Sequence, residues 1–471
     1  MATRTRSRKR SRGYRAALLR AEPSSRPLLK TTDHGNPIGV DAKAIGAVGD
    51  RWVEPFLVAN NLALKRLELR PEVRADRELK VLLHPGPRIG AVPLLSPVTR
   101  KVAAGLLIEP RFRWTALGAV FNAIGFSVEP VLGGAPLVPG SAREVPPWIL
   151  AGPVIERVAG LLQHRRRGFV QRTETRQSPR GQVQWTQWAR NQIPSGQWDK
   201  FPCRFSEPDD DPDLIAAVRW TLLRLEDELS TVASSLPGRF LLRRTEELLA
   251  EIGPGTIKHP ISALGQPAAS EWISNAIEAM TWVAEERGLG GARTLDGLAW
   301  DLSIDSVWEA WVASFAAALA RQLGMTASPF GSARRIIHWQ GPIHSMGSLR
   351  PDVELRDQDR VVWIDAKYKR HLEQLARGGW TGLSEDIRGE HRADLHQALA
   401  YASLADVTQV DTLLVYPQPA YDPRPLKTLA TVTSGRRRVR LILTSIPFGY
   451  PNPGCEVQQL HDFRDRILRT T

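Results

Sequence analysis

The segment from Arg350 to Lys369 constrains the fold more than any other part of this 471-residue chain. Every second residue from Pro351 to Leu355 is apolar, and so is every second residue from Val362 to Ala366. The polar run from Asp357 to Arg360 separates these two stretches. An apolar residue at every second position on both sides of a polar turn predicts a β-hairpin.

The register of this hairpin follows from its turn. A turn centred between Gln358 and Asp359 places Asp352 directly opposite Asp365. Side chains in that relation have Cβ atoms about 4.5–5.5 Å apart, so two carboxylates repel unless a cation lies between them. A hard divalent cation with oxygen ligands, above all Mg²⁺, resolves this conflict. The hairpin therefore predicts a metal site formed by Asp352 and Asp365.

A lysine belongs to the same predicted site. Lys367 follows Asp365 by two residues, so both side chains point to one face of the strand. An ammonium group beside a metal ion orients or polarises an attacking water and stabilises charge on a phosphate. The Asp-x-Lys triplet thus favours chemistry on a phosphate group.

Two helical patterns flank the hairpin. The first, Ile304–Leu323, has a buried apolar stripe, and Glu309 lies beside that stripe within reach of a metal ion. In the second, Asp394–Ala405, the side chains of Gln397 and Tyr401 share one face. We interpret Gln397 as lining the site and Tyr401 as part of the core.

The order of these motifs resembles the PD-(D/E)xK nuclease superfamily: a helical glutamate, a Pro-Asp pair, an Asp-x-Lys triplet and a helix with Gln-x-x-x-Tyr. More closely, the chain resembles McrC, the nuclease subunit of McrBC-type modification-dependent restriction systems, over residues 85–417. The segments that carry the resemblance are LLIEPRF (106–112), RRRGFVQRTET (165–175), SPRGQVQW (178–185), the run at 201–225, DSVWEAWV (305–312), LRPDVEL (349–355), IDAKYK (364–369), DLHQALAYA (394–402) and LLVYP (413–417).

The resemblance implies a metal-dependent endonuclease that cleaves DNA in anti-phage defence. It implies that Asp352, Asp365 and Glu309 bind Mg²⁺, with Mn²⁺ as a substitute, and that Lys367 and Gln397 complete the catalytic set. It also implies that the chain docks onto a McrB-like AAA+ GTPase or ATPase ring. The chain has no G-x-x-x-x-G-K-[ST] sequence, so a nucleotide-driven motor has to be a separate subunit.

The residues alone leave alternatives open. A Pro-Asp pair followed by Asp-x-Lys also occurs by chance in a surface hairpin. The chain would then be a catalytically silent DNA-binding or ring-stimulating scaffold subunit. A stand-alone nuclease acting on RNA would carry the same residues. Glu309 is alternatively a solvated helix residue, and we interpret Glu354, on the face of Asp352, as a solvated strand carboxylate.

The charge balance favours a polyanionic partner. Lys and Arg number 63 against 50 Asp and Glu, which gives a net charge of +13, as is common in nucleic-acid-binding proteins. Seven of the basic groups lie in the acid-free segment 1–15. The basic clusters at 164–167 and 436–440 fit phosphate contacts and solvated faces equally well. Trp185, Trp188 and Trp198 are interpreted as packing residues, with base stacking as the alternative.

Segment patterns predict a multidomain cytosolic protein. No apolar run reaches the ~18 residues of a membrane span, and two cysteines cannot form a disulfide framework. We expect a disordered basic tail at 1–35, a β-rich assembly domain at 36–150, a helical middle region at 151–290 and an α/β domain at 295–471. The last is expected to be a mixed sheet flanked by helices, of PD-(D/E)xK type, after a flexible joint at Gly288–Gly291.

Overall fold

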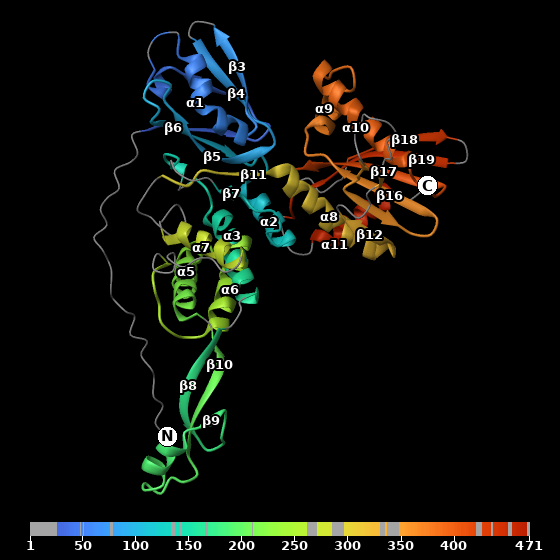
Figure 1. Ribbon diagram of the computed structural model, residues 1–471. Coiled ribbons are helices and arrows are strands. Elements are labelled where there is room, and N and C mark those ends of the chain that lie inside the picture. The colour runs from blue at the N-terminus through green and yellow to red at the C-terminus, as the bar shows by residue number, and fades with distance from the viewer. Residues whose placement is uncertain are drawn as a thin grey trace, which may run out of the picture. The chain divides into compact units, whose positions relative to one another are not determined.

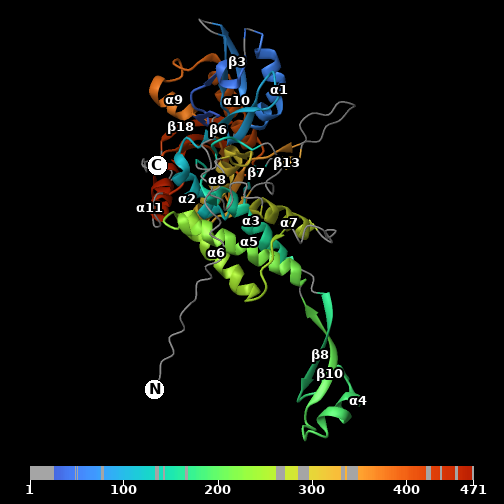
Figure 2. The same cartoon turned by 90° about the vertical axis from the view of Figure 1, so that its left-hand side faces the viewer.

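The computed structural model divides the chain into two compact units (Figure 1, Figure 2). Unit 1 consists of Met1–Pro146, Ser235–Pro237 and Gly291–Thr471, and unit 2 of Pro147–Ser234 and Gly238–Gly290. The structure describes residues 26–47, 49, 51–75, 79–132, 137–141, 144–164, 168–209, 211–260, 271–284, 296–329, 335–336, 348–420, 426–434, 437–450 and 455–468. The basic segment 1–15 and the expected joint at Gly288–Gly291 lie outside these residues. In the described ranges, no helix is long and apolar enough to cross a membrane.

Two sheets and two helices make up the N-terminal part of unit 1. A five-stranded sheet has the order β1-β6-β5-β11-β7, and a three-stranded sheet has the order β2-β4-β3. In the larger sheet β1 runs parallel to β6, and the other pairs are antiparallel. The elements are β1 (Leu28–Thr32), β2 (Ile38–Asp41), α1 (Val53–Arg66), β3 (Arg70–Ala75), β4 (Leu79–His84), β5 (Arg88–Leu95), β6 (Val102–Glu109), α2 (Arg113–Ile124), β7 (Val131–Leu132) and β11 (Trp300–Ser303).

One expectation for this N-terminal part is wrong, and another needs an addition. The segment expected to be disordered includes strand β1, because Leu28–Thr32 pairs along its whole length with β6. The expected β-rich domain at 36–150 also contains a helix, because Val53–Arg66 forms α1. Phe56, Asn60 and Leu64 are its buried residues, and their four-residue spacing is typical of a helix that buries one face.

The C-terminal part of unit 1 is a six-stranded mixed sheet with the order β12-β15-β16-β17-β19-β18. The three inner neighbours β16, β17 and β19 run parallel, and the outer pairs are antiparallel. The strands are β12 (Thr326–Pro329), β15 (Val353–Arg356), β16 (Arg360–Ala366), β17 (Gln409–Gln418), β18 (Lys427–Ser434) and β19 (Arg437–Pro447), and a separate pair is formed by β13 (Arg335–Ile336) and β14 (Ser348–Leu349). A mixed sheet with helices packed on it confirms the expected α/β class.

Four helices accompany this sheet: α8 (Ile304–Leu323), α9 (His371–Gly378), α10 (Glu385–Ser403) and α11 (Cys455–Phe463). The bounds of α8 agree with the prediction because the sequence marks both ends. Ser303 accepts a hydrogen bond from the backbone N–H of Ser306, and Gly324 ends the helix in the left-handed conformation.

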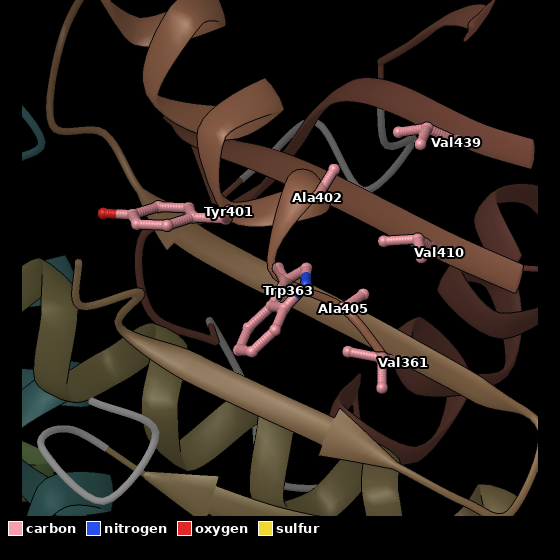
Figure 3. Packing of buried hydrophobic residues seen from close by; sticks show 7 residues of the cluster. All are labelled: Val361, Trp363, Tyr401, Ala402, Ala405, Val410 and Val439. Carbon is pink, nitrogen blue, oxygen red and sulfur yellow. The ribbon is translucent and has the colours of Figure 1, made fainter. Parts of the chain in front are cut away.

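Helix α10 packs against one face of the parallel strands. Figure 3 shows Tyr401, Ala402 and Ala405 around Trp363 and Val361 of β16, with Val410 and Val439 from the neighbouring strands; the hydroxyl of Tyr401 points away from the other six side chains. The expectation that Tyr401 belongs to the core is confirmed. This packing fixes α10 beside the end of β16, where Asp365 lies.

Unit 2 combines a group of helices with a long antiparallel arm (Figure 1). The helices are α3 (Pro147–His164), α4 (Trp185–Gln187), α5 (Pro212–Thr231), α6 (Leu236–Ile252) and α7 (Glu271–Ala284), and the arm consists of β8 (Gly168–Arg176), β9 (Gln182–Val183) and β10 (Phe201–Asp209). The expected helical middle region thus also contains an antiparallel arm, which the sequence analysis did not predict. The residues of β8 from 171 to 176 are all exposed, so the apolar alternation that identifies a strand is missing.

Aromatic side chains gather where the arm ends. Trp185 is 60% exposed and Trp198 is 69% exposed, so neither is buried, although Trp185 packs edge-on against Trp188 and Phe201. Trp188 stacks on Phe201 with ring centroids 5.9 Å apart, and its indole N–H donates to the backbone carbonyl of Trp198 at 3.1 Å. These two contacts hold Trp188 against Phe201 and fix the backbone of the exposed Trp198.

Candidate active site

The hairpin that carries the candidate site has the predicted register. Val353 of β15 lies opposite Ile364 of β16, and one step further along this register brings Asp352 opposite Asp365. A carboxylate oxygen of Asp352 accepts a hydrogen bond of 2.7 Å from the backbone N–H of Ala366. This bond ties the Asp352 side chain to the end of β16, beside Asp365.

Burial makes the two aspartates reluctant to ionise together. Desolvation, followed by the charge of Asp365, raises the pKa of Asp352 to about 7. Desolvation also raises the pKa of Asp365, although the adjacent Lys367 ammonium opposes this effect. Asp365 is only 3% exposed. A buried pair of carboxylates with raised pKa values is typical of functional sites, where an added cation would stabilise both charges.

Lys367 contributes a permanent positive charge. Its Nζ lies 2.7 Å from Oδ2 of Asp365 and donates to Oε1 of Gln397 at 2.9 Å. Burial alone would lower the pKa of Lys367, but the charges of Asp365, Asp394 and Asp352 raise it above its ordinary value. Lys367 therefore remains an ammonium group near neutral pH and acts as a donor of hydrogen bonds rather than as a base.

Helix α8 adds further carboxylates on the same side. Burial, and then the charge of Asp365, raises the pKa of Glu309. Asp305 lies one helical turn earlier, and burial together with the charge of Glu309 raises its pKa to about 7. The sequence analysis missed Asp305, although its spacing of four residues from Glu309 places both side chains on one helix face.

Helix α10 provides the polar wall of the site. Gln397 accepts from Lys367 through Oε1 and donates through Nε2 to the hydroxyl of Tyr401 at 2.6 Å. That hydroxyl in turn donates to the backbone carbonyl of Arg350 at 3.0 Å. The chain of hydrogen bonds fixes the amide of Gln397 with its oxygen toward Lys367, so the structure brings Gln397 to the predicted place.

The five predicted residues therefore share one neighbourhood: Asp352 and Asp365 at the end of the hairpin, Lys367 between Asp365 and Gln397, and Glu309 within electrostatic reach of Asp365. The donor set is three carboxylates without a thiol or imidazole. Oxygen donors of this kind suit Mg²⁺ and Mn²⁺. By donor chemistry, Asp352, Asp365 and Glu309 would suit a hard divalent cation, although among the described residues their oxygens are not gathered as a group of three within 4.8 Å.

A second group of buried polar residues lies next to this site. Ligand atoms of His371, His391 and Asp394 lie within 4.8 Å of one another, close enough to surround a metal ion. However, the Nζ of Lys369 donates to both carboxylate oxygens of Asp394 at 3.0 Å. An ammonium group already provides the cation for this carboxylate, so we interpret the group as an ion-paired cluster. The sequence analysis missed Lys369 and Asp394.

Two interpretations of charged residues are corrected by the structure. Glu354 is 6% exposed and pairs with Arg356 at 2.5 Å, so it is a buried ion-pair partner and not a solvated carboxylate. Arg440, in the basic cluster at 436–440, is also 6% exposed. It pairs with Asp411 at 2.5 Å, which leaves it neither solvated nor available for a phosphate.

Tyr368, next to Lys367, connects the site to the N-terminal part of unit 1. Its hydroxyl donates at 2.7 Å to Oδ2 of Asp33, whose other oxygen accepts from the backbone N–H of Arg111 at 2.6 Å. Both Tyr368 and Asp33 are buried. Burial raises the pKa of Asp33, while the nearby Arg111 opposes this effect. A residue beside the catalytic candidate is thus fixed by a strand end more than 300 positions earlier.

We expect Tyr368→Phe to lower the free energy of unfolding by about 1–3 kcal/mol, because Asp33 then loses a donor in a buried position. Urea denaturation measures this change. In an Asp33→Ala background the same substitution should have a much smaller effect, since only the weak contact from Arg111 Nε at 3.3 Å remains to be lost. Additive losses in the double variant would show that Tyr368 stabilises the fold by some other contact.

This chain is similar to chains of two solved structures. It is similar to a chain of the refined half-complex of tetradecameric Thermococcus gammatolerans McrB AAA+ hexamers with bound McrC, with 13% identity and a TM-score of 0.43, over 93% of this chain and 100% of that one. It is also similar to a chain of the Thermococcus gammatolerans McrBC complex, with 14% identity and a TM-score of 0.25, over 63% of this chain and 88% of that one. No protein-family model and no curated protein matches the chain.

Proposed function

We propose that this chain is a divalent-cation-dependent endonuclease that hydrolyses phosphodiester bonds in DNA. One observation carries the proposal: the ammonium of Lys367 lies 2.7 Å from Asp365, in a site that also holds the carboxylates of Asp352 and Glu309. Three carboxylates and one ammonium in a partly desolvated site are suited to binding a cation and a phosphate together. The motif order, which resembles that of McrC, supports DNA as the substrate.

The residues would divide the work as follows. Asp352, Asp365 and Glu309 would hold the ion, which would supply Lewis-acid charge to the phosphate and favour ionisation of the attacking water. Lys367 donates hydrogen bonds to the attacking water or to a phosphate oxygen, and stabilises the negative charge that develops there. Gln397 limits the positions open to the Lys367 ammonium, because its oxygen accepts from Nζ at 2.9 Å.

We also propose that a separate AAA+ GTPase or ATPase ring activates the chain. The support is the sequence, which resembles McrC and has no phosphate-binding loop of its own. The test is an assay of plasmid cleavage by the purified chain with Mg²⁺, with EDTA, and with a McrB-like ring plus nucleotide. The proposal expects weak cutting by the chain alone and strong cutting with the ring. Cutting of RNA but not DNA would contradict the substrate, and no cutting under any condition would favour the silent scaffold.

The affinity for Mg²⁺ should depend on pH through Asp352. Its pKa of about 7 lies above the ~3.9 of an aspartate in an unfolded chain. The folded, metal-free chain therefore keeps a proton that the unfolded chain releases. The stability that this group contributes is full below pH ~4 and is lost as the pH rises through ~7.

Because the ion must displace this proton, we expect the affinity for Mg²⁺ to fall about tenfold per pH unit below pH 7.

Calorimetric titration with Mg²⁺ in buffers of different ionisation enthalpy measures this effect. Near pH 6 the binding should release about one proton, and near pH 8 almost none. The variant Asp352→Asn is the control, since its side chain has no proton to release. Equal affinities on both sides of pH 7 would contradict a metal site that includes Asp352.

A further inference from the structure

We propose that Asp394 is a positioning residue that takes over the Lys367 ammonium when a divalent cation binds Asp365. The inference rests on the proposed function, because it concerns how the same site changes on cation binding. It assigns a role to a buried residue of α10 that is outside the set of Asp352, Asp365, Glu309, Lys367 and Gln397. The argument starts from the acceptors that surround one nitrogen atom.

The Lys367 Nζ lies among three acceptors at different distances. Oδ2 of Asp365 is 2.7 Å away, Oε1 of Gln397 is 2.9 Å away, and Oδ1 of Asp394 is 3.7 Å away. The contact with Asp365 is a close ion pair, the contact with Gln397 is a hydrogen bond, and the distance to Asp394 is too long for one. A displacement of about 1 Å would bring Nζ to the ~2.8 Å that is normal for an ammonium–carboxylate hydrogen bond with Asp394.

Binding of a divalent cation makes such a displacement necessary. Asp365 cannot give a full ion pair to Lys367 and also hold a divalent ion, because the two cations would compete for one carboxylate and repel each other. Lys367 remains charged, so it needs another anionic partner in a site where an unpaired ammonium is costly. Asp394 is the carboxylate next in reach, and Gln397 is hydrogen-bonded to Nζ and can keep that bond during the movement.

The residues around Asp394 keep its carboxylate ionised, as an acceptor for Lys367 requires. It is 5% exposed, and both of its oxygens accept from Lys369 at 3.0 Å. Nδ1 of His371 lies 3.7 Å from its Oδ2. Although burial alone would raise the pKa of Asp394, the contacts with His371, Lys369 and Lys367 lower it. Asp394 is therefore ionised near neutral pH.

A double-mutant cycle on Mn²⁺ binding tests the proposal without any cleavage assay. The full-length chain and its variants are titrated with Mn²⁺, and free Mn²⁺ is measured by electron paramagnetic resonance. Asp394→Asn should weaken Mn²⁺ binding about tenfold, because Lys367 then stays on Asp365 and competes with the ion. In a Lys367→Met background, Asp394→Asn should leave the affinity unchanged, because the competing ammonium is already absent.

The matched control is Glu390→Gln, one helical turn before Asp394 on α10. Its carboxylate lies 3.8 Å from Lys369 Nζ and 3.4 Å from His371 Nε2, so it samples the same cluster; Mn²⁺ affinity should not change. Asp394→Glu, which keeps the charge, should restore most of the lost affinity. Equal weakening by Asp394→Asn with and without Lys367 would overturn the proposal, and so would unchanged affinity in the single variant.

The proposed function fails separately from this inference. If the wild-type chain binds Mn²⁺ and the cycle behaves as expected, but no DNA is cut with any partner, the nuclease assignment is wrong. The proposed movement of Lys367 from Asp365 to Asp394 then stands. If DNA is cut in an Asp365-dependent manner while the cycle shows no coupling between Asp394 and Lys367, only the proposed role of Asp394 is wrong. A wild-type chain that does not bind Mn²⁺ would overturn both.

Discussion

Replacing Asp365 with asparagine should lower the rate of Mg²⁺-dependent DNA cleavage about 1,000-fold. The side chain keeps its shape and loses its charge, so the fold should remain. The loss is large because Asp365 carries two roles in the proposed site, as a ligand of the ion and as the partner of Lys367 at 2.7 Å. Several kcal/mol of charge stabilisation then disappear from the transition state, and each ~1.4 kcal/mol corresponds to a factor of ten.

Initial rates of plasmid nicking, with the activating ring present, measure this loss. Asp359→Asn is the matched control, because Asp359 belongs to the same hairpin and is exposed in its turn; it should cut at the wild-type rate. Circular dichroism and binding to the ring should be the same for all three proteins. Undiminished cutting by Asp365→Asn would remove the residue from the mechanism, and equal losses in both variants would point to damage to the hairpin.

The hairpin was predictable because two local signals agree. Alternating apolar residues fix which side chains share a face, and a short polar turn fixes which residues lie opposite each other. Both signals are read within twenty positions, and the observed pairing of Val353 with Ile364 is the predicted one. The helix Ile304–Leu323 was predictable for a similar reason, because a serine and a glycine mark its ends.

The environment of Lys367 was not predictable, because it depends on residues brought together by the sheet. The sequence predicts Asp394 only as the first residue of a helix, yet it lies inside α10 and accepts from Lys369 in a buried cluster. Asp33 is more than 300 residues from Tyr368, and nothing local relates the two. In the long arm, β8 is exposed from 171 to 176 and shows no apolar alternation there; β10 does alternate at Phe201, Cys203 and Phe205, a signal that the sequence analysis did not use.

Arg440 shows why a run of basic residues is a poor guide to a phosphate site. The cluster at 436–440 was read as a phosphate contact or a solvated face. In the structure β19 alternates its side chains between faces, and its residue Arg440 points to buried Asp411 on β17. Arginine side chains are rarely buried in proteins unless they pair with a carboxylate or another partner. Arg440 therefore stabilises the sheet through Asp411 and is not part of a basic surface.

Removing the carboxylate of Asp411 should destabilise the C-terminal sheet by about 3–5 kcal/mol. Asp411 is 3% exposed and accepts from the guanidinium of Arg440 at 2.5 and 2.7 Å and from Nε of Arg360 at 2.8 Å. These residues belong to three neighbouring strands, β16, β17 and β19. Asp411→Ala leaves two guanidinium groups in a desolvated position without their carboxylate, and an unpaired buried charge is costly.

Chemical denaturation of Asp411→Ala and of Asp406→Ala separates this effect from the general loss of an ion pair. Asp406 pairs with Arg356 at 2.7 Å, but its side chain is 72% exposed, so its loss should cost only about 0–1 kcal/mol. In Asp411→Ala/Arg440→Met part of the stability should return, since one of the two unpaired charges is then absent. Similar losses of stability for Asp411→Ala and Asp406→Ala would mean that the buried ion pairs of Asp411 contribute no more than an exposed ion pair. Strand β16 also carries Asp365, one residue before its end. Asp411→Ala should therefore also lower cleavage because less of the protein is folded, while the affinity of the remaining folded protein for Mn²⁺ stays unchanged.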